Sequence, residues 1–96
     1  MIIKESKEYM KWFKKLKDER VKTVIYYRTM MIMNFNHFGD TKAVGDNIFE
    51  LRIHIGAGYR IYYTIKGNEV VYLLSGGDKS TQEKDIEKAR RIAKEV

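Results

Sequence analysis

Half-way along the chain the spacing of apolar residues changes from a helical period to strict alternation, which indicates a domain with both helices and strands. Apolar residues alternate with polar ones over residues 48–55 and 59–65, and a third apolar run covers residues 70–75. Strict alternation is typical of strands with one buried face, and short Gly-containing connections favour hairpins. We therefore predict an antiparallel meander of three strands, which turns at Gly56-Ala57-Gly58 and at Lys66-Gly67-Asn68-Glu69.

Helical periodicity precedes these strands. Ser6 can cap a helix with a stripe of apolar residues at i, i+3, i+4 and i+7. That stripe consists of Tyr9, Trp12, Phe13 and Leu16. Asp18 can cap a second helix that continues to about Asn34, so the two predict an αα-hairpin. Residues 35–47 are rich in turn formers and are predicted to be a loop.

A last helix follows the strands. Ser80-x-x-Glu83 has the pattern of a capping box, and Ile86, Ala89, Ala93 and Val96 fall on one side of the helix it would open. The predicted order is αα-βββ-α, with room for a fourth short strand at residues 1–4. We expect one α+β domain spanning residues 1–96, with the helices packed on one face of the sheet.

Composition excludes several classes of protein. The chain has no cysteine, which excludes disulfide scaffolds, thiolate metal sites and cysteine nucleophiles, and its two histidines are too few for most dedicated metal cages. No apolar run is long enough for a membrane span and no secretory leader is evident, so we expect a cytoplasmic protein without membrane contact. The net charge of +6 favours polyanionic partners such as nucleic acid, although a basic balance can also serve solubility alone.

Strand pairing predicts a cationic surface. If the first hairpin closes around Ala57, Arg52 and His54 lie on the same face as Arg60. Further members of this surface are Tyr62, Ser75 and, at the start of the last helix, Lys79. In this register His54 would lie opposite Arg60, Arg52 opposite Tyr62, and Arg60 opposite Ser75. Such a face could bind a phosphodiester and unstacked bases, or it could be an ordinary solvated sheet face.

Five ordered motifs resemble one known family. They are Trp12-Phe13-Lys14-Lys15-Leu16, Phe38-Gly39-Asp40, Phe49-Glu50-Leu51-Arg52-Ile53, Gly58-Tyr59-Arg60-Ile61-Tyr62-Tyr63 and Gly77-Asp78-Lys79-Ser80-Thr81-Gln82. Together they resemble the HigB-like branch of the RelE/ParE toxin superfamily over nearly the whole chain. The resemblance implies a RelE-like microbial RNase-type fold and, for most members, ribosome-dependent cleavage of mRNA.

The resemblance also implies partners. Such toxins are neutralised by a cognate antitoxin, in this branch usually a helix-turn-helix protein of the HigA type. That antitoxin represses the operon, so operator DNA is contacted through it. The basic surface and the adaptable methionines and tyrosines of the two N-terminal helices favour that surface for the antitoxin contact.

Roles follow from the same resemblance. By position Arg60 would stabilise the scissile phosphate, with Arg52 and Lys79 as further catalytic cations. His54 is a candidate acid or base because histidine changes charge near neutral pH. The predicted RNA-binding residues are Tyr59, Tyr62, Ser75 and Ser80. No metal and no other cofactor are expected for this chemistry.

Two departures from the family pattern are evident. Some relatives carry a tyrosine early in the last helix that orients the ribose 2′-OH, whereas this chain has Glu83-Lys84-Asp85 there. Ala57 replaces a common proline of the hairpin. The first departure leaves the general base unassigned, and the second affects only the rigidity of the turn.

Two other functions stay open: a ParE-like toxin that poisons DNA gyrase without catalysis, and a degenerate toxin kept for antitoxin binding and operon co-repression.

Overall fold

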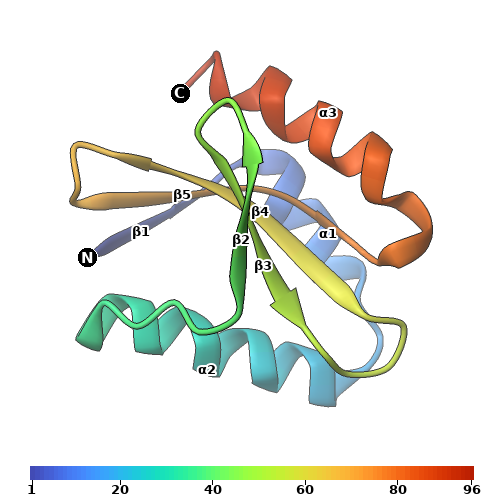
Figure 1. Cartoon of the computed structure of the whole chain (residues 1–96). Helices are drawn as coiled ribbons and strands as arrows, with labels where there is room; N and C mark the ends of the chain where they lie inside the picture. The colour runs from blue at the N-terminus through green and yellow to red at the C-terminus, as the bar shows by residue number, and fades with distance from the viewer.

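The computed structural model describes residues 1–96 and is an α+β fold, as predicted (Figure 1). Its elements are β1 (Ile2–Glu5), α1 (Lys7–Lys15), α2 (Glu19–Phe35), β2 (Thr41–Gly45), β3 (Ile48–Ile53), β4 (Tyr59–Lys66), β5 (Val70–Gly77), a short 3₁₀ turn (Lys79–Thr81) and α3 (Gln82–Ala93). None of the helices is long and apolar enough to cross a membrane.

The sheet is larger than predicted. Its five strands lie in the order β1-β5-β4-β3-β2, and β1 runs parallel to β5 whereas all other pairs are antiparallel. The predicted loop over residues 35–47 is wrong in part, because β2 forms within it. Asp46 and Asn47 join β2 to β3, and their φ angles of 54° and 59° are those of a tight hairpin turn.

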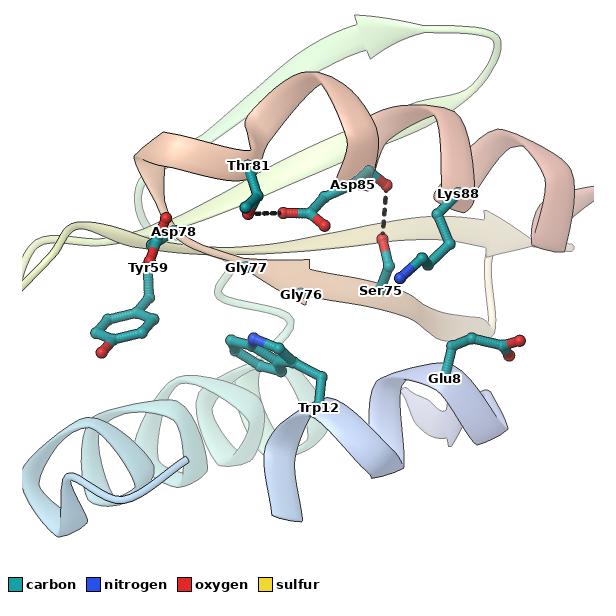
Figure 2. A pocket seen from close by; sticks show the side chains of 10 residues that line it. All are labelled: Glu8, Trp12, Tyr59, Ser75, Gly76, Gly77, Asp78, Thr81, Asp85 and Lys88. Atoms are coloured by element: carbon teal, nitrogen blue, oxygen red, sulfur yellow. Dashed lines mark hydrogen bonds between the residues drawn. The ribbon is translucent and has the colours of Figure 1, made fainter. Parts of the chain in front are cut away.

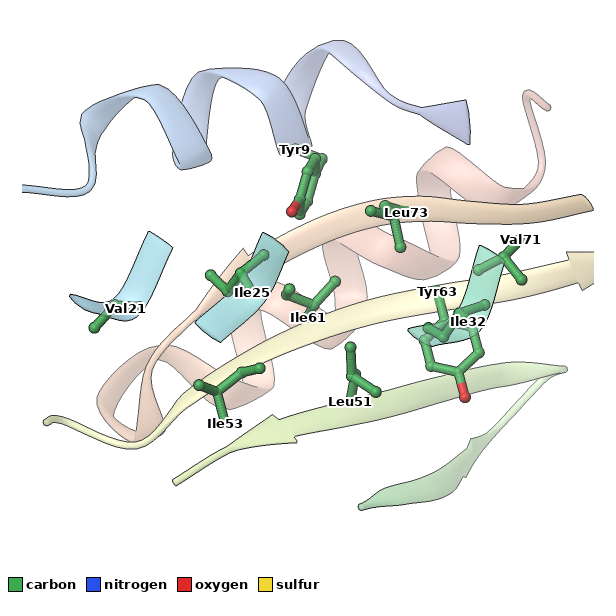
Figure 3. Close-up of a cluster of buried hydrophobic side chains, with 10 residues drawn as sticks. All are labelled: Tyr9, Val21, Ile25, Ile32, Leu51, Ile53, Ile61, Tyr63, Val71 and Leu73. Carbon is green, nitrogen blue, oxygen red and sulfur yellow. The ribbon is translucent and has the colours of Figure 1, made fainter. Parts of the chain in front are cut away.

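Helices cover both faces of the sheet, which corrects the prediction that they share one face. The larger core lies between the sheet and the helices α1 and α2, and Figure 3 shows its ten buried side chains. The second core lies between the sheet and α3 and contains Ile48, Tyr62, Leu74, Ala89 and Ile92. Strand residues alternate between the cores, so Ile61 joins the first and Tyr62 the second.

Helix starts are confirmed at two of three positions. Ser6 accepts a hydrogen bond from the backbone N–H of Tyr9 and Asp18 accepts one from that of Arg20, as N-caps do. The capping box at Ser80 is wrong. Asp78 instead accepts from the backbone N–H of Ser80 and opens the 3₁₀ turn, so that α3 begins only at Gln82.

The strand register differs from the prediction by two residues at the first hairpin. Arg52 pairs with Arg60, rather than Tyr62, because the turn centres on Gly56 and not on Ala57. Gly56 and Gly58 have φ angles of 59° and 76°, a region that glycine enters without steric cost. A shift of two residues keeps every side chain on its face and changes only its cross-strand partner.

The second hairpin is also shifted. A β-bulge between Tyr62 and Tyr63 changes the register along β4 and β5. Tyr62 lies opposite Ser75, and Arg60 lies opposite Gly77 rather than opposite Ser75 as predicted. This places Arg60 beside the glycine that ends β5, next to the turn that carries Lys79.

Candidate functional site

A buried carboxylate, Glu50, organises the candidate site. Arg52 and Arg60 are cross-strand partners, and two like charges in such a pair destabilise a sheet unless they are neutralised. The Glu50 Oε1 atom accepts a hydrogen bond from Arg60 Nε at 3.2 Å and lies 4.0 Å from Arg52 Nε. Its Oε2 atom accepts one from Gln82 Nε2 at 3.1 Å. Glu50 therefore joins two strands and the start of α3.

Arg60 is held rather than free. Its side chain is 12% exposed, and that of Glu50 is 3% exposed. Besides the bond from Nε to Glu50, the Arg60 Nη1 atom donates to the carbonyl of Gly58 at 2.9 Å. The remaining nitrogen, Nη2, bonds to no protein atom and stays open to solvent. The edge of the guanidinium that carries Nη2 is thus positioned to donate to an external anion.

A second cluster adjoins the first at the C-terminal end of β3, and Arg52 belongs to both. Arg52 donates from Nε and Nη2 to Asp40 Oδ1, at 3.1 and 2.9 Å. His54 Nε2 contacts the other carboxylate oxygen, Oδ2. His54 follows the last residue of β3 and its side chain is 70% exposed, so it does not lie opposite Arg60 as predicted. Its site is the Asp40 cluster.

Arg28 of α2 fixes the segment that carries Asp40. Its guanidinium donates to the carbonyls of Arg52 at 2.7 Å, of Phe38 at 2.9 Å and of Asp40 at 3.2 Å. Burial lowers the pKa of this guanidinium. Gly39, with a φ of 71°, lets the chain turn around it. The long helix α2 therefore sets the position of a loop residue on the sheet.

Lys79 completes the cationic group. It lies in the 3₁₀ turn after β5, is exposed, and makes no ion pair. Its aliphatic chain packs on Gly58, where an added Cβ would lie 3.2 Å from Lys79 Cε. Because the Gly58 carbonyl also accepts from Arg60, the β3–β4 turn brings the two cations to one end of the sheet.

Two predicted RNA-binding residues are buried and do not form an exposed surface. Tyr62 is fully buried under α3, where desolvation raises the pKa of its hydroxyl well above the usual range. Ser75 is 2% exposed and donates from Oγ to the carbonyl of Asp85. The predicted sheet face is open only at its end, because α3 covers the rest.

Tyr59 and Ser80 lie nearer the surface. Tyr59 is half-buried and packs against Trp12, with ring centroids 6.4 Å apart. Ser80 is exposed, and its hydroxyl donates to Asp78. Ser80 therefore shapes the turn that presents Lys79.

Comparisons with known proteins identify the family. A model of the family described as Phage derived protein Gp49-like (DUF891) matches residues 11–95. An uncharacterised protein of Haemophilus influenzae is 47% identical over 94 residues, which cover 98% of this chain and 94% of the relative. The chain belongs to the Gp49-like family.

Solved structures show which fold this Gp49-like chain has. A mutant of the Escherichia coli toxin RelE in the free state aligns over 95% of this chain and 96% of its own, with a TM-score of 0.72 and 19% identity. A chain of the intact E. coli RelBE toxin–antitoxin complex aligns over 80% of this chain and 94% of its own, with a TM-score of 0.66 and 18% identity. The Gp49-like chain thus has the RelE fold, as the sequence motifs implied.

The sequence of this Gp49-like protein did not predict a role in the site for three residues: Asp40, Glu50 and Gln82. Glu50 alternates with Arg52 along the predicted strand, so its place on the cationic face was available as a signal. Asp40 and Gln82 lie outside the strands, and their approach depends on α2 and α3. No group of three or more acidic, His or Cys side chains that could hold a metal is present.

The Asp40 cluster predicts an acid-sensitive contribution to stability. Hydrogen bonds from His54 and Arg52 lower the pKa of Asp40, so its stabilising effect is complete above the ordinary pKa and is lost as pH falls through the lowered value. We expect the unfolding free energy of the parent to fall more steeply than that of Asp40→Asn between about pH 5 and about pH 2. Urea titrations at each pH measure this, with Glu87→Gln as a control for the loss of one carboxylate. Parallel pH profiles of the parent and Asp40→Asn would contradict the expectation.

Proposed function

We propose that this chain is the toxin of a type II toxin–antitoxin module and cleaves mRNA on the ribosome as a metal-independent endoribonuclease. The observation that supports this most directly is the convergence of Arg60 and Lys79 on the β3–β4 turn of a RelE fold. Membership of the HigB-like branch belongs to the same proposal and rests on the sequence motifs.

The proposed reaction is an attack of the ribose 2′-OH on the adjacent phosphorus. The 2′-OH gives up its proton to a base as it attacks, the bond from phosphorus to the 5′ oxygen breaks, and that oxygen takes up a proton. The products are a 2′,3′-cyclic phosphate and a 5′-hydroxyl. Negative charge develops on the non-bridging oxygens, where fixed donors stabilise it most. The free Nη2 of Arg60 and the ammonium of Lys79 supply those donors, and Glu50 positions the first of them.

His54 is the proposed acid or base, which would accept the proton of the 2′-OH or donate a proton to the departing 5′ oxygen. Its Nε2 atom faces Asp40, which leaves Nδ1 and an exposed ring for the substrate. A carboxylate that orients a histidine in this way fixes which nitrogen exchanges the proton. Arg52 holds the same carboxylate through two bonds and thus positions His54.

The proposed partner is a HigA-like antitoxin that binds operator DNA. Its contact surface on this chain is the exposed side of α1 and α2. Large apolar side chains gather there, and Tyr26 and Phe35 are 66% and 71% exposed. Residues of this kind on a protein surface favour contact with another protein.

Induction in a bacterial host tests the function. We expect growth arrest together with new 5′ ends inside translated messages, and suppression of both by co-expression of the antitoxin. Arrest with intact messages and gyrase-linked DNA breaks would instead identify a ParE-like poison. The observation that favours a degenerate toxin is the pairing of both arginines with carboxylates, and absence of arrest would support that function.

A further inference from the structure

A cavity lies between α1 and α3, beside the end of β5 that extends past its last pair with β1, Glu5–Leu73, and Tyr59 is part of its lining. Its volume is about 330 Å³, at the lower end of the range for small-ligand pockets. Figure 2 shows Trp12 on one side of β5 and Asp85 on the other, with Tyr59 at the end of the cavity. Neither Trp12 nor Asp85 takes part in the proposed nuclease site.

Two consecutive glycines, Gly76 and Gly77, leave the space that the side chains of Trp12 and Asp85 occupy. A Cβ on Gly76 would lie 2.4 Å from Trp12 Cε3, and a Cβ on Gly77 would lie 1.8 Å from Asp85 Oδ2. Since successive strand residues point to opposite faces, each glycine makes room on its own side. The strand edge is therefore shaped to bring an indole and a carboxylate to one cavity.

One carboxylate oxygen of Asp85 accepts no hydrogen bond from the protein. The residue is 7% exposed, and its Oδ2 atom accepts a hydrogen bond from Thr81 Oγ1 at 2.6 Å. The Oδ1 atom has no partner within the protein and is not sealed off from solvent. Burial raises the pKa of Asp85, and the nearby Asp78 adds to this, whereas the Thr81 bond, Lys88 and Lys84 oppose it. A cationic ligand would favour the charged form.

The charges of the residues that line the cavity indicate that its ligand is positively charged. Glu8, Asp78 and Asp85 are acidic and Lys88 alone is basic, so the cavity is acidic in a chain whose net charge is +6. The aromatic walls add an attraction for cations, because the face of an indole or phenol ring carries negative charge. The same acidic lining disfavours a phosphate.

We propose that this cavity binds an arginine side chain of a protein partner. The guanidinium donates to Asp85 Oδ1 and lies against the Trp12 ring, while Tyr59 closes the far end. A planar guanidinium can both stack on an aromatic face and donate a directed hydrogen bond, which a lysine ammonium cannot do equally well. The cavity shares Tyr59 with the predicted RNA-binding residues and adjoins the turn that carries Lys79, but Trp12 and Asp85 have no role in the proposed cleavage.

Trp12 reports occupancy directly, because it is the single tryptophan of the chain. The probe is the peptide acetyl-Gly-Arg-Gly-amide, added at constant ionic strength while Trp12 fluorescence and its indole N–H resonance are recorded. We expect a saturable shift of both signals. The matching citrulline peptide, which is neutral but of similar shape, should leave them unchanged.

Variants of the intact chain test the charge dependence. We expect Asp85→Asn to weaken binding of the arginine peptide about tenfold or more, as loss of a charge-assisted bond does. Glu8→Gln, at an exposed position, should weaken it less, and Lys88→Ala should strengthen it by removing a competing cation. Glu87→Gln, on the same helix but outside the cavity, should have no effect.

Three results would overturn the proposal. One is equal binding of the citrulline and arginine peptides, and another is unchanged affinity in both Asp85→Asn and Glu8→Gln. The third is a Trp12 shift with guanosine monophosphate that Lys88→Ala weakens, since this would identify a nucleotide site. Circular dichroism of each variant confirms that the fold is retained, and Glu8→Gln keeps the test decisive if Asp85→Asn does not fold.

Discussion

Lys79→Ala is expected to reduce mRNA cleavage about 10²–10³-fold, the usual loss when one donor to a developing oxyanion is removed. Lys79 is exposed and forms no ion pair, so its removal should leave the fold intact. Mapping of 5′ ends after induction measures cleavage, and thermal unfolding of the purified variant measures stability. The same amount of cleavage with Lys79→Ala as with the parent would refute its catalytic role.

Lys94→Ala is the matched control, because it removes an exposed lysine beyond the end of α3, away from the site. Arg60→Ala should also abolish cleavage, but it strips Glu50 of its partner and so lowers stability as well. Arg60→Lys separates the two effects. It keeps the charge beside Glu50 and loses the forked geometry, so we expect a folded protein with strongly reduced cleavage.

Glu50→Ala is expected to lower the free energy of unfolding by about 3–5 kcal/mol, the typical effect of removing one partner from a buried ion pair. The Arg60 side chain, 12% exposed, would keep its charge without a carboxylate, and Gln82 would lose its acceptor. Urea unfolding followed by circular dichroism measures the difference. Glu87→Ala removes an exposed glutamate from α3 and should change stability by less than about 0.5 kcal/mol.

A double-mutant cycle sharpens this prediction. If Glu50 serves chiefly to neutralise Arg60, the variant that lacks both should be less destabilised than the sum of the two single variants. Additive losses would mean that Glu50 stabilises the fold through other contacts, such as the one with Gln82, and would contradict its role in neutralising Arg60.

Local chemistry accounts for what could be predicted from the sequence. Ser6 and Asp18 cap α1 and α2 because a side-chain oxygen placed before a helix satisfies a free backbone N–H, whatever the rest of the chain does. The alternation of β3 and β4 likewise defines which residues share a face, so Arg52 and Arg60 were correctly placed on one side of the sheet. Both signals extend over only a few residues.

The failures have a common cause in contacts between distant segments. The residue pattern did not predict β2, because turn-forming residues flank its five residues on both sides. These residues form a strand only by pairing with β3. Asp78, and not Ser80, acts as the N-cap, because it lies closer to the end of β5 and accepts the hydrogen bonds that open the 3₁₀ turn. Neither the pairing of β2 nor the choice of Asp78 as cap can be recognised from the local residue pattern.

Residue patterns along the chain are therefore enough to predict the three helices, the meander and the sheet face that carries the cations. How much of that face is open to solvent depends on the packing of α3, which covers part of it and buries Tyr62 and Ser75. Tertiary packing also places Glu50 against Arg60 and admits Trp12 and Asp85 to one cavity beside two glycines. Periodicity fixes the direction of a side chain, whereas its partners depend on packing between segments far apart along the chain.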